Sequence, residues 1–96
     1  MKIYYEVEFL EATLDHVIGL IAIPIYEILS VYEVVPTETE SNTYKDLAPF
    51  FLIDKEGNEY SNIENGFYMG TINLGKYHVE GKWTEDHNFR VTIYLN

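Results

Sequence analysis

The sequence predicts a single α+β domain, in which an antiparallel sheet of about five to seven strands packs with one helix. Apolar and polar residues alternate with a period of two near both ends of the chain, which indicates strands with one buried face. Between Leu14 and Ile21 the apolar residues instead follow helical spacing. The length of 96 residues and the hydrophobic content of 47% favour one domain, residues 1–96, with its own core.

The first strand is expected over residues 2–9. Its apolar residues occupy every second position, so we expect them to face the core while Tyr4, Glu6 and Glu8 face solvent. The apolar set consists of Ile3, Tyr5, Val7 and Phe9.

Residues 12–35 carry conflicting patterns. Thr13 is a suitable N-cap and Asp15 suits a first helical turn, so we predict a helix over residues 13–22. Pro24 would end this helix, and a strand would follow over residues 26–35. The density of β-branched residues in this segment favours a different interpretation, in which two strands replace the helix and the fold is an all-β barrel.

The second half of the chain predicts an antiparallel meander. Residues 50–53 and 58–60 flank a turn that contains Gly57, which indicates a hairpin. A strand is expected over residues 66–74, with Gly70 as a bulge or a point of close backbone approach, and Gly75 turns it into a strand over residues 77–83. The last strand covers residues 89–96, and residues 36–45 form a polar loop.

Several function classes find no support in the sequence. The chain has no cysteine, so it has no disulfide and no thiolate metal site. It has no phosphate-binding, nucleotide-binding or nucleophile motif, and its three histidines form no ligand set. We therefore expect no enzymatic activity, no metal and no cofactor. The apolar run over residues 17–25 is too short to span a membrane, and we expect a cytoplasmic protein.

The acidic residues are distributed unevenly. Residues 3–44 contain eight acidic side chains and no Lys or Arg, and the chain has a formal net charge of −10. Glu6 and Glu8 lie two residues apart, and Glu38 and Glu40 repeat that spacing. Alternate strand residues are about 6.6 Å apart, and duplex DNA advances about 3.4 Å per phosphate. The spacing fits carboxylates that occupy the positions of phosphates, while the simpler interpretation is a charged face that keeps the domain soluble.

We therefore expect a non-enzymatic acidic inhibitor or binding protein that docks onto the basic, nucleic-acid-binding surface of a partner protein. The candidate contact residues are Glu6, Glu8, Glu38, Glu40, Tyr4 and Tyr32. The two tyrosines would serve as aromatic anchors. In size and acidity the chain resembles small phage and mobile-element inhibitors, such as anti-CRISPR and anti-restriction proteins, and bacteriocin immunity proteins. That resemblance implies an anti-defence role, but no motif carries it.

Two other functions compete with this hypothesis. One is a structural or assembly module, such as a small virion or oligomer component. The other is a small-ligand-binding barrel, which requires the all-β alternative and an apolar cavity. Direct binding to nucleic acid is disfavoured because six basic residues are dispersed among sixteen acidic ones. The sequence leaves the oligomeric state open.

Overall fold

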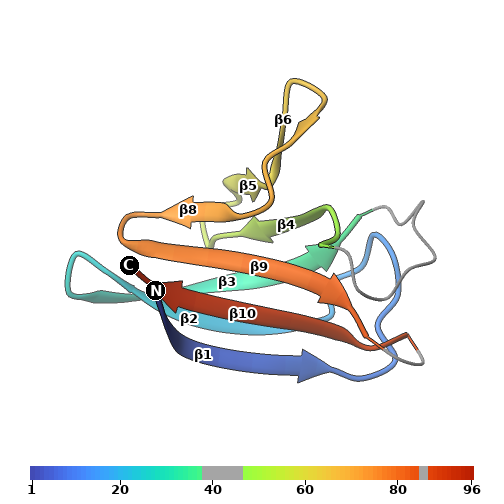
Figure 1. The fold of residues 1–96 in the computed structure, drawn as a ribbon, viewed down its shortest axis with the longest axis horizontal. Helices are drawn as coiled ribbons and strands as arrows, with labels where there is room; N and C mark the ends of the chain where they lie inside the picture. Colours follow the sequence, from blue (N-terminus) through green and yellow to red (C-terminus); the bar gives the residue numbers. More distant parts are fainter. Residues whose placement is uncertain (38–46, 85–86) are drawn as a thin grey trace.

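The computed structural model of the protein describes residues 1–37, 47–84 and 87–96, and within these ranges it is built from β-strands without an α-helix. Two four-stranded antiparallel sheets pack face to face, with the orders β1-β10-β9-β8 and β2-β3-β4-β5 (Figure 1). A small third sheet pairs β6 with β7. The strands are β1 (Lys2–Phe9), β2 (Gly19–Ile25), β3 (Ile28–Pro36), β4 (Phe50–Ile53), β5 (Glu59–Ser61), β6 (Ile63–Glu64), β7 (Phe67–Tyr68), β8 (Ile72–Leu74), β9 (Tyr77–Trp83) and β10 (Phe89–Leu95).

The predicted helix over residues 13–22 is wrong, and with it the α+β class. Asp15 has a φ of 60°, which a right-handed helix cannot include, and residues from Gly19 onward form β2. The alternation of buried Ile21 and Ile23 with outward Leu20 and Ala22 decides in favour of a strand. Pro24 is tolerated because β2 is an edge strand, where a missing donor costs no ladder bond. The all-β alternative is right about the class, but the pairing gives two sheets and not a barrel.

The first strand pairs with the last one. β1 runs antiparallel to β10 from Lys2 opposite Leu95 to Phe9 opposite Phe89, so the two chain ends meet (Figure 1). The other strands follow each other in chain order around the two sheets, from β2 to β5 and from β8 to β10. Because β1 is then the outer strand of one sheet and β2 the outer strand of the other, the chain passes between the sheets at this edge.

The core fills the space between the sheets. Phe50 of β4 and Phe89 of β10 are fully buried, and their rings meet edge to face at 5.8 Å between centroids. Trp83 contacts Phe89 in the same way at 5.1 Å. Since β4 and β10 belong to different sheets, the contact between Phe50 and Phe89 holds the two layers together, while Trp83 supports Phe89 from the neighbouring strand of its own sheet.

Two glycines allow aromatic rings to approach the backbone. A Cβ atom on Gly81 would lie 2.6 Å from Cζ of Phe89 and 2.9 Å from Cδ1 of Phe50. A Cβ atom on Gly19 would lie 2.0 Å from Cε1 of Phe9, so the last residue of β1 packs directly on β2. The glycine in β9 therefore makes room for the central ring pair, and the glycine in β2 closes the edge between the sheets.

The predicted alternation in β1 breaks near its start. The register against β10 shifts between Ile3 and Tyr5, and both side chains are exposed, at 58% and 50%. Beyond the shift, Val7 and Phe9 are partly buried against the core while Glu6 and Glu8 face outward, as expected. The bulge reverses the facing of Ile3, which precedes it, but not that of Tyr5, which lies opposite Ile93.

The β4–β5 hairpin matches its prediction and is organised by Asp54. Its Oδ1 accepts hydrogen bonds from the backbone N–H groups of Glu56 and Asn58, both at 2.9 Å. Its Oδ2 accepts from the Asn58 amide at 3.0 Å and from the Tyr60 hydroxyl at 3.1 Å. Desolvation opposes ionisation of this carboxyl, but the hydrogen bonds together outweigh it and lower the pKa of Asp54 below its ordinary value.

The single strand predicted over residues 66–74 is interrupted. Asn65 and Gly66 have φ values of 52° and 81° and form a tight turn between β6 and β7. Gly70, with a φ of 83°, then separates this hairpin from β8. The signal for a break at Gly70 was therefore present in the sequence, but it marks the end of one hairpin and not a bulge within a strand.

Replacing Gly81 by Ala should destabilise the fold by about 1–3 kcal/mol, because the added methyl group meets two buried rings that have no room to move. Chemical denaturation measures this loss. The variant Phe89→Leu removes the nearest ring atom, so the loss caused by Gly81→Ala should be smaller in that background. An equal loss in both backgrounds would mean that the ring contact does not limit this position.

The ionised form of Asp54 should stabilise the native state. Because its pKa is lowered in the folded chain, the folded state binds fewer protons than the unfolded chain near the ordinary value of 3.8. Its contribution is present above that pH and is lost as the pH falls through the folded-state value. An NMR titration of the side-chain carboxyl should place its midpoint below 3.8. The difference in melting temperature between the wild type and Asp54→Asn should disappear at the acidic end, and a constant difference would contradict this role.

Candidate functional site

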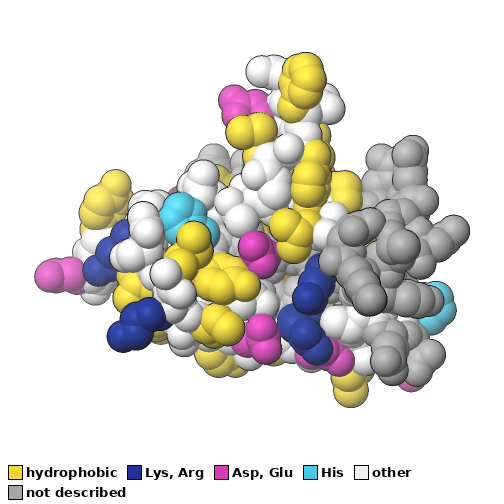
Figure 2. Space-filling view, viewed as in Figure 1, with side chains coloured by type: hydrophobic (Ala, Val, Ile, Leu, Met, Phe, Trp, Pro, Cys, Tyr) yellow, Lys and Arg dark blue, Asp and Glu magenta, His cyan; other side chains and the backbone are white. Residues whose placement is uncertain are grey.

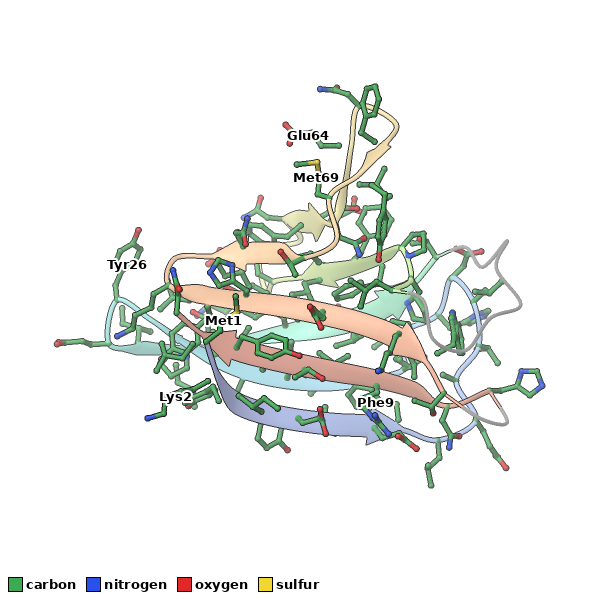
Figure 3. All side chains as sticks on the ribbon, viewed as in Figure 1. Met1, Lys2, Phe9, Tyr26, Glu64 and Met69 are labelled. Atoms are coloured by element: carbon green, nitrogen blue, oxygen red, sulfur yellow. The ribbon has the colours of Figure 1, made fainter. Side chains whose placement is uncertain are left out.

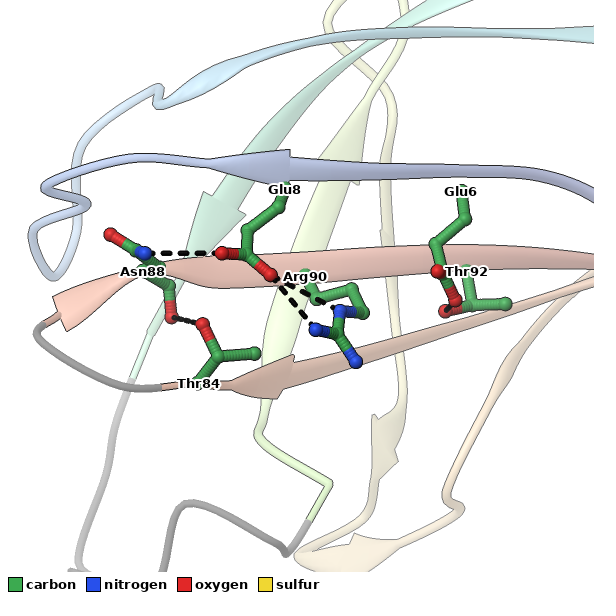
Figure 4. A network of polar contacts seen from close by, with 6 residues as sticks. All are labelled: Glu6, Glu8, Thr84, Asn88, Arg90 and Thr92. Atoms are coloured by element: carbon green, nitrogen blue, oxygen red, sulfur yellow. Dashed lines mark hydrogen bonds and ion pairs between the residues drawn. The ribbon is translucent and has the colours of Figure 1, made fainter.

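The two strand glutamates proposed as partner contacts are engaged within the protein. Arg90 donates to Oε1 of Glu8 from Nη2 at 3.0 Å and from Nε at 3.2 Å, and Asn88 donates to Oε2 at 3.1 Å (Figure 4). The Thr92 hydroxyl donates to Oε2 of Glu6 at 2.9 Å. These contacts follow from the pairing of β1 with β10, which sets Glu8 opposite Arg90 and Glu6 opposite Thr92.

The outer face of sheet β1-β10-β9-β8 carries charges of both signs. Figure 2 shows this side of the molecule, with acidic and basic side chains close together. The described acids on these strands and their β8–β9 turn are Glu6, Glu8 and Glu80, and the bases are Lys2, Lys76, Lys82 and Arg90. Glu80 is also engaged, because it forms a hydrogen bond with Tyr94. Burial of Tyr94, the negative charge of Glu80 and this hydrogen bond together raise the pKa of the tyrosine. This face is therefore not the one-signed field that the sequence predicts.

The structure does not bring the other predicted contact residues together. Tyr32 is 5% exposed and packs edge to face against Tyr60 in the core, at 5.8 Å between centroids, so it is not available as a surface anchor. Tyr4 is 44% exposed and lies against Tyr77 at 5.2 Å. Glu38 and Glu40 lie outside the described residues.

A different surface has the composition of a binding site. Most outward residues of sheet β2-β3-β4-β5 are apolar, with Glu33, Glu59 and Ser61 as the polar ones, and we call the apolar set the apolar face. Its members are Leu20, Ala22 and Pro24 of β2, Leu29, Val31 and Val35 of β3, and Phe51 and Ile53 of β4. Leu20, Leu29 and Val31 are the most open, at 60%, 64% and 47% exposure.

The strand register brings these residues onto one face. Ala22 lies opposite Val31, Pro24 lies opposite Leu29, and Val35 lies opposite Phe51. Opposite residues in antiparallel strands point to the same side of the sheet. The alternate residues, such as Ile21, Ile23 and Val34, point into the core and are fully or almost fully buried. The apolar residues thus share one outer layer, which Glu33 interrupts between Val31 and Val35.

Acidic side chains lie within the apolar face and around it. Glu33 lies within it, opposite Leu20 and Ile53, and Glu59 lies at its β5 side opposite Ile53. Glu27 and Glu56 are exposed in the adjoining turns. The described residues of β2 to β5 and their turns include five acidic side chains, Asp54 among them, and one basic side chain, Lys55. The excess negative charge of the described protein is therefore concentrated on this side of the sandwich.

The described residues contain neither a cluster of metal-ligating side chains nor a helix that could span a membrane. No group of three or more His, Asp or Glu side chains among them is arranged to hold a metal ion. His16 contacts the carbonyl of Leu14 at 2.6 Å, and His78 contacts Asn73. Within the described ranges, no helix is long and apolar enough to cross a membrane.

Comparisons of the chain with protein-family models, with characterised proteins and with solved structures find no match. The assignment of the apolar face as the candidate site therefore depends on its geometry and composition alone. The sequence did contain its signal, because Leu20, Ala22 and Pro24 fill the positions between Ile21, Ile23 and Ile25. A strand that is apolar on both faces is expected where both faces are covered.

The apolar face should bind hydrophobic dyes, and its open residues should contribute little to stability. Replacing Leu29 and Val31 by Ser should lower the fluorescence of an added naphthalene sulfonate dye while changing the free energy of unfolding by about 0.5 kcal/mol or less per site. Val34→Thr is the control, since it buries a hydroxyl group in the same strand and should cost about 1–3 kcal/mol. Unchanged dye binding in the double variant would show that the face is not exposed.

Proposed function

We propose that this protein is a non-enzymatic binding protein that docks through its apolar face onto a partner protein whose own apolar patch is bordered by basic residues. The observation that carries this proposal is the combination of an exposed, largely apolar sheet face with acidic side chains within and around it. Specific interfaces have this anatomy, with an apolar centre and a polar, solvent-exposed rim.

The apolar centre supplies the affinity. Soluble monomers rarely leave a large contiguous apolar patch exposed, and such patches mark interaction sites. Burial of apolar surface contributes about 25 cal/mol per Å², although the entropy lost on association offsets much of that gain. Leu20, Leu29 and Val31 have the most surface left to bury, so they are the expected energetic centre.

The acidic border supplies the choice of partner. Rim charges accelerate encounter with a surface of opposite sign and disfavour partners of like sign. With five acids and one base among the described residues of this side, the expected partner is basic. Nucleic-acid-binding proteins present surfaces of that kind. The proposed partner is therefore a nucleic-acid-binding protein, and this chain would act as its inhibitor.

The outer face of the other sheet is a weaker candidate. A partner that docks onto Glu6 and Glu8 must displace the contacts that Thr92, Arg90 and Asn88 already make with them. The exposed ion pair of Glu8 with Arg90 contributes only about 0.2–1 kcal/mol. A partner that breaks this pair would have its binding free energy reduced by that amount. A ligand-binding barrel is also disfavoured, because Ile23, Leu52, Val79 and Ile93 fill the space between the sheets at 0% exposure.

Quantitative affinity capture from a cell lysate, read by mass spectrometry, tests the docking surface. The variant Leu29→Ser with Val31→Ser should reduce capture of the specific partner at least tenfold, which corresponds to about 1.4 kcal/mol. Retained proteins should carry net positive charge and should elute as the salt concentration rises.

Two charge-reversal variants separate the rim from net charge. Glu56→Lys with Glu59→Lys should weaken capture strongly, whereas Glu6→Lys with Glu8→Lys changes the net charge equally on the other sheet and should weaken it much less. Equal losses would mean that only net charge matters. A larger loss from the Glu6 and Glu8 pair would move the docking surface to the first sheet and overturn the proposal.

A further inference from the structure

Residues 62–70 form a projection, here called the finger, that extends from the sandwich between β5 and β8 (Figure 1). Asn62 fixes its base and is fully buried. The Asn62 side chain accepts a hydrogen bond from the N–H of Phe50 at 3.0 Å and donates to the carbonyl of Ala48 at 2.8 Å. Its backbone carbonyl accepts from the N–H of Met69 at 2.6 Å, which closes the hairpin. A two-stranded hairpin alone is only marginally stable, so this buried clamp explains why the finger holds its position.

The finger presents apolar side chains to solvent. Phe67 is 73% exposed and Met69 is 56% exposed. Glu64 lies on the same hairpin, and Figure 3 shows Glu64 and Met69 together on one side of it. Aromatic residues and Met are enriched at the centres of interfaces. A preorganised projection with these side chains loses little conformational entropy when it docks.

The same molecule contains a pocket of matching character at one end of the sandwich. Two hairpin turns, residues 24–27 and 74–77, line an open hollow of about 430 Å³, within the range of about 300–1,000 Å³ that binding pockets span. We call it the end pocket. Pro24, Ile25, Leu74 and Tyr77 give it apolar walls, and Lys76 and Glu27 contribute opposite charges.

The turn beside the end pocket is held in an unfavourable conformation. Tyr26 and Glu27 have φ values of 49° and 65°, in the left-handed region where two-residue turns normally place Asn and Gly. Tyr26 is also 89% exposed and points away from the body at this end (Figure 3). Strained positions of this kind cluster at ligand-contacting sites.

We propose that the finger of one copy of this protein docks into the end pocket of a second copy. Phe67 and Met69 then cover the apolar walls, and Glu64 pairs with Lys76. Lys76 is placed for this role, because its ammonium group lies 5.9 Å from the centre of the Tyr77 ring, on the pocket wall. Within the described ranges, the ion pair between Glu8 and Arg90 is the only one formed, so neither Glu64 nor Lys76 has a competing partner of this kind. Glu27 lies on the opposite turn from Lys76 and repels Glu64, so the two charges together orient the finger.

Long-range repulsion opposes this contact. Each copy carries a formal charge of −10, so two copies repel each other at low ionic strength. Screening shortens the reach of this repulsion to about 10 Å in 0.1 M salt, while the apolar part of the contact is not weakened. Self-association should therefore strengthen with salt, whereas docking onto a basic partner should weaken. This opposite response makes the inference independent of the proposed function, and either can fail alone.

Analytical ultracentrifugation of the whole chain over a concentration series, at about 0.05 M and about 0.5 M salt, measures the association. The wild type should show species heavier than the 11.2 kDa monomer, and more of them at high salt. Phe67→Ser with Met69→Ser should weaken association at least tenfold. Leu10→Ser, which removes an apolar side chain that is 72% exposed elsewhere, should leave it unchanged.

A charge exchange identifies the two surfaces. Glu64→Lys and Lys76→Glu should each weaken association, and the variant carrying both should restore it at the original net charge. If net charge alone governed association, Glu64→Lys would strengthen it. A mixture of the Phe67→Ser, Met69→Ser variant with Lys76→Glu should also associate, because one supplies an intact pocket and the other an intact finger. A wild type that stays monomeric at high salt, or a double charge variant that is not restored, would overturn the proposal.

Discussion

The antiparallel pairing of the first strand with the last is the interaction on which the rest of the structure depends. It brings residues eighty or more positions apart into register, places Phe9 opposite Phe89, and makes β10 an inner strand of its sheet. The same pairing sets Glu8 opposite Arg90. The basic residues of the last strands therefore offset the acids of the first, and among the described residues most of the excess negative charge is left on the other sheet.

The two sheets consequently have different outer faces. One is polar and internally bonded, with Glu6 held by Thr92 and Glu80 held by Tyr94. The other is apolar, with Leu29 and Val31 open to solvent and acids at its border. A sandwich needs only its inner faces to be apolar. The second apolar layer is not required for folding, and this is the physical reason for assigning it to binding.

The sequence predicts those elements whose signals are local. The strands at both ends, the hairpin around Gly57 and the turn at Gly75 follow from alternation and turn chemistry. The helix over residues 13–22 fails because the apolar spacing that predicts it joins two different structures. Leu14, Val17 and Ile18 precede β2 in an irregular segment where Asp15 has a φ of 60°, and Ile21 belongs to β2 itself. The candidate site could not be predicted from charge spacing, because strand pairing decides which acids are neutralised. Tyr32 likewise belongs to the core because of the strand register. That register places Glu33 opposite Leu20 on the outer face, so its neighbour Tyr32 points inward.

The most direct test measures which methyl groups of β2 and β3 are open to solvent. A one-residue change of register would exchange the two faces of these strands. In NMR spectra recorded with a soluble paramagnetic agent, the methyl signals of Leu20, Leu29 and Val31 should be strongly attenuated, while those of Ile21, Ile23 and Val34 should be protected. Protection of Leu29 and Val31 together with attenuation of Ile23 and Val34 would contradict the register, the apolar face and the function assigned to it.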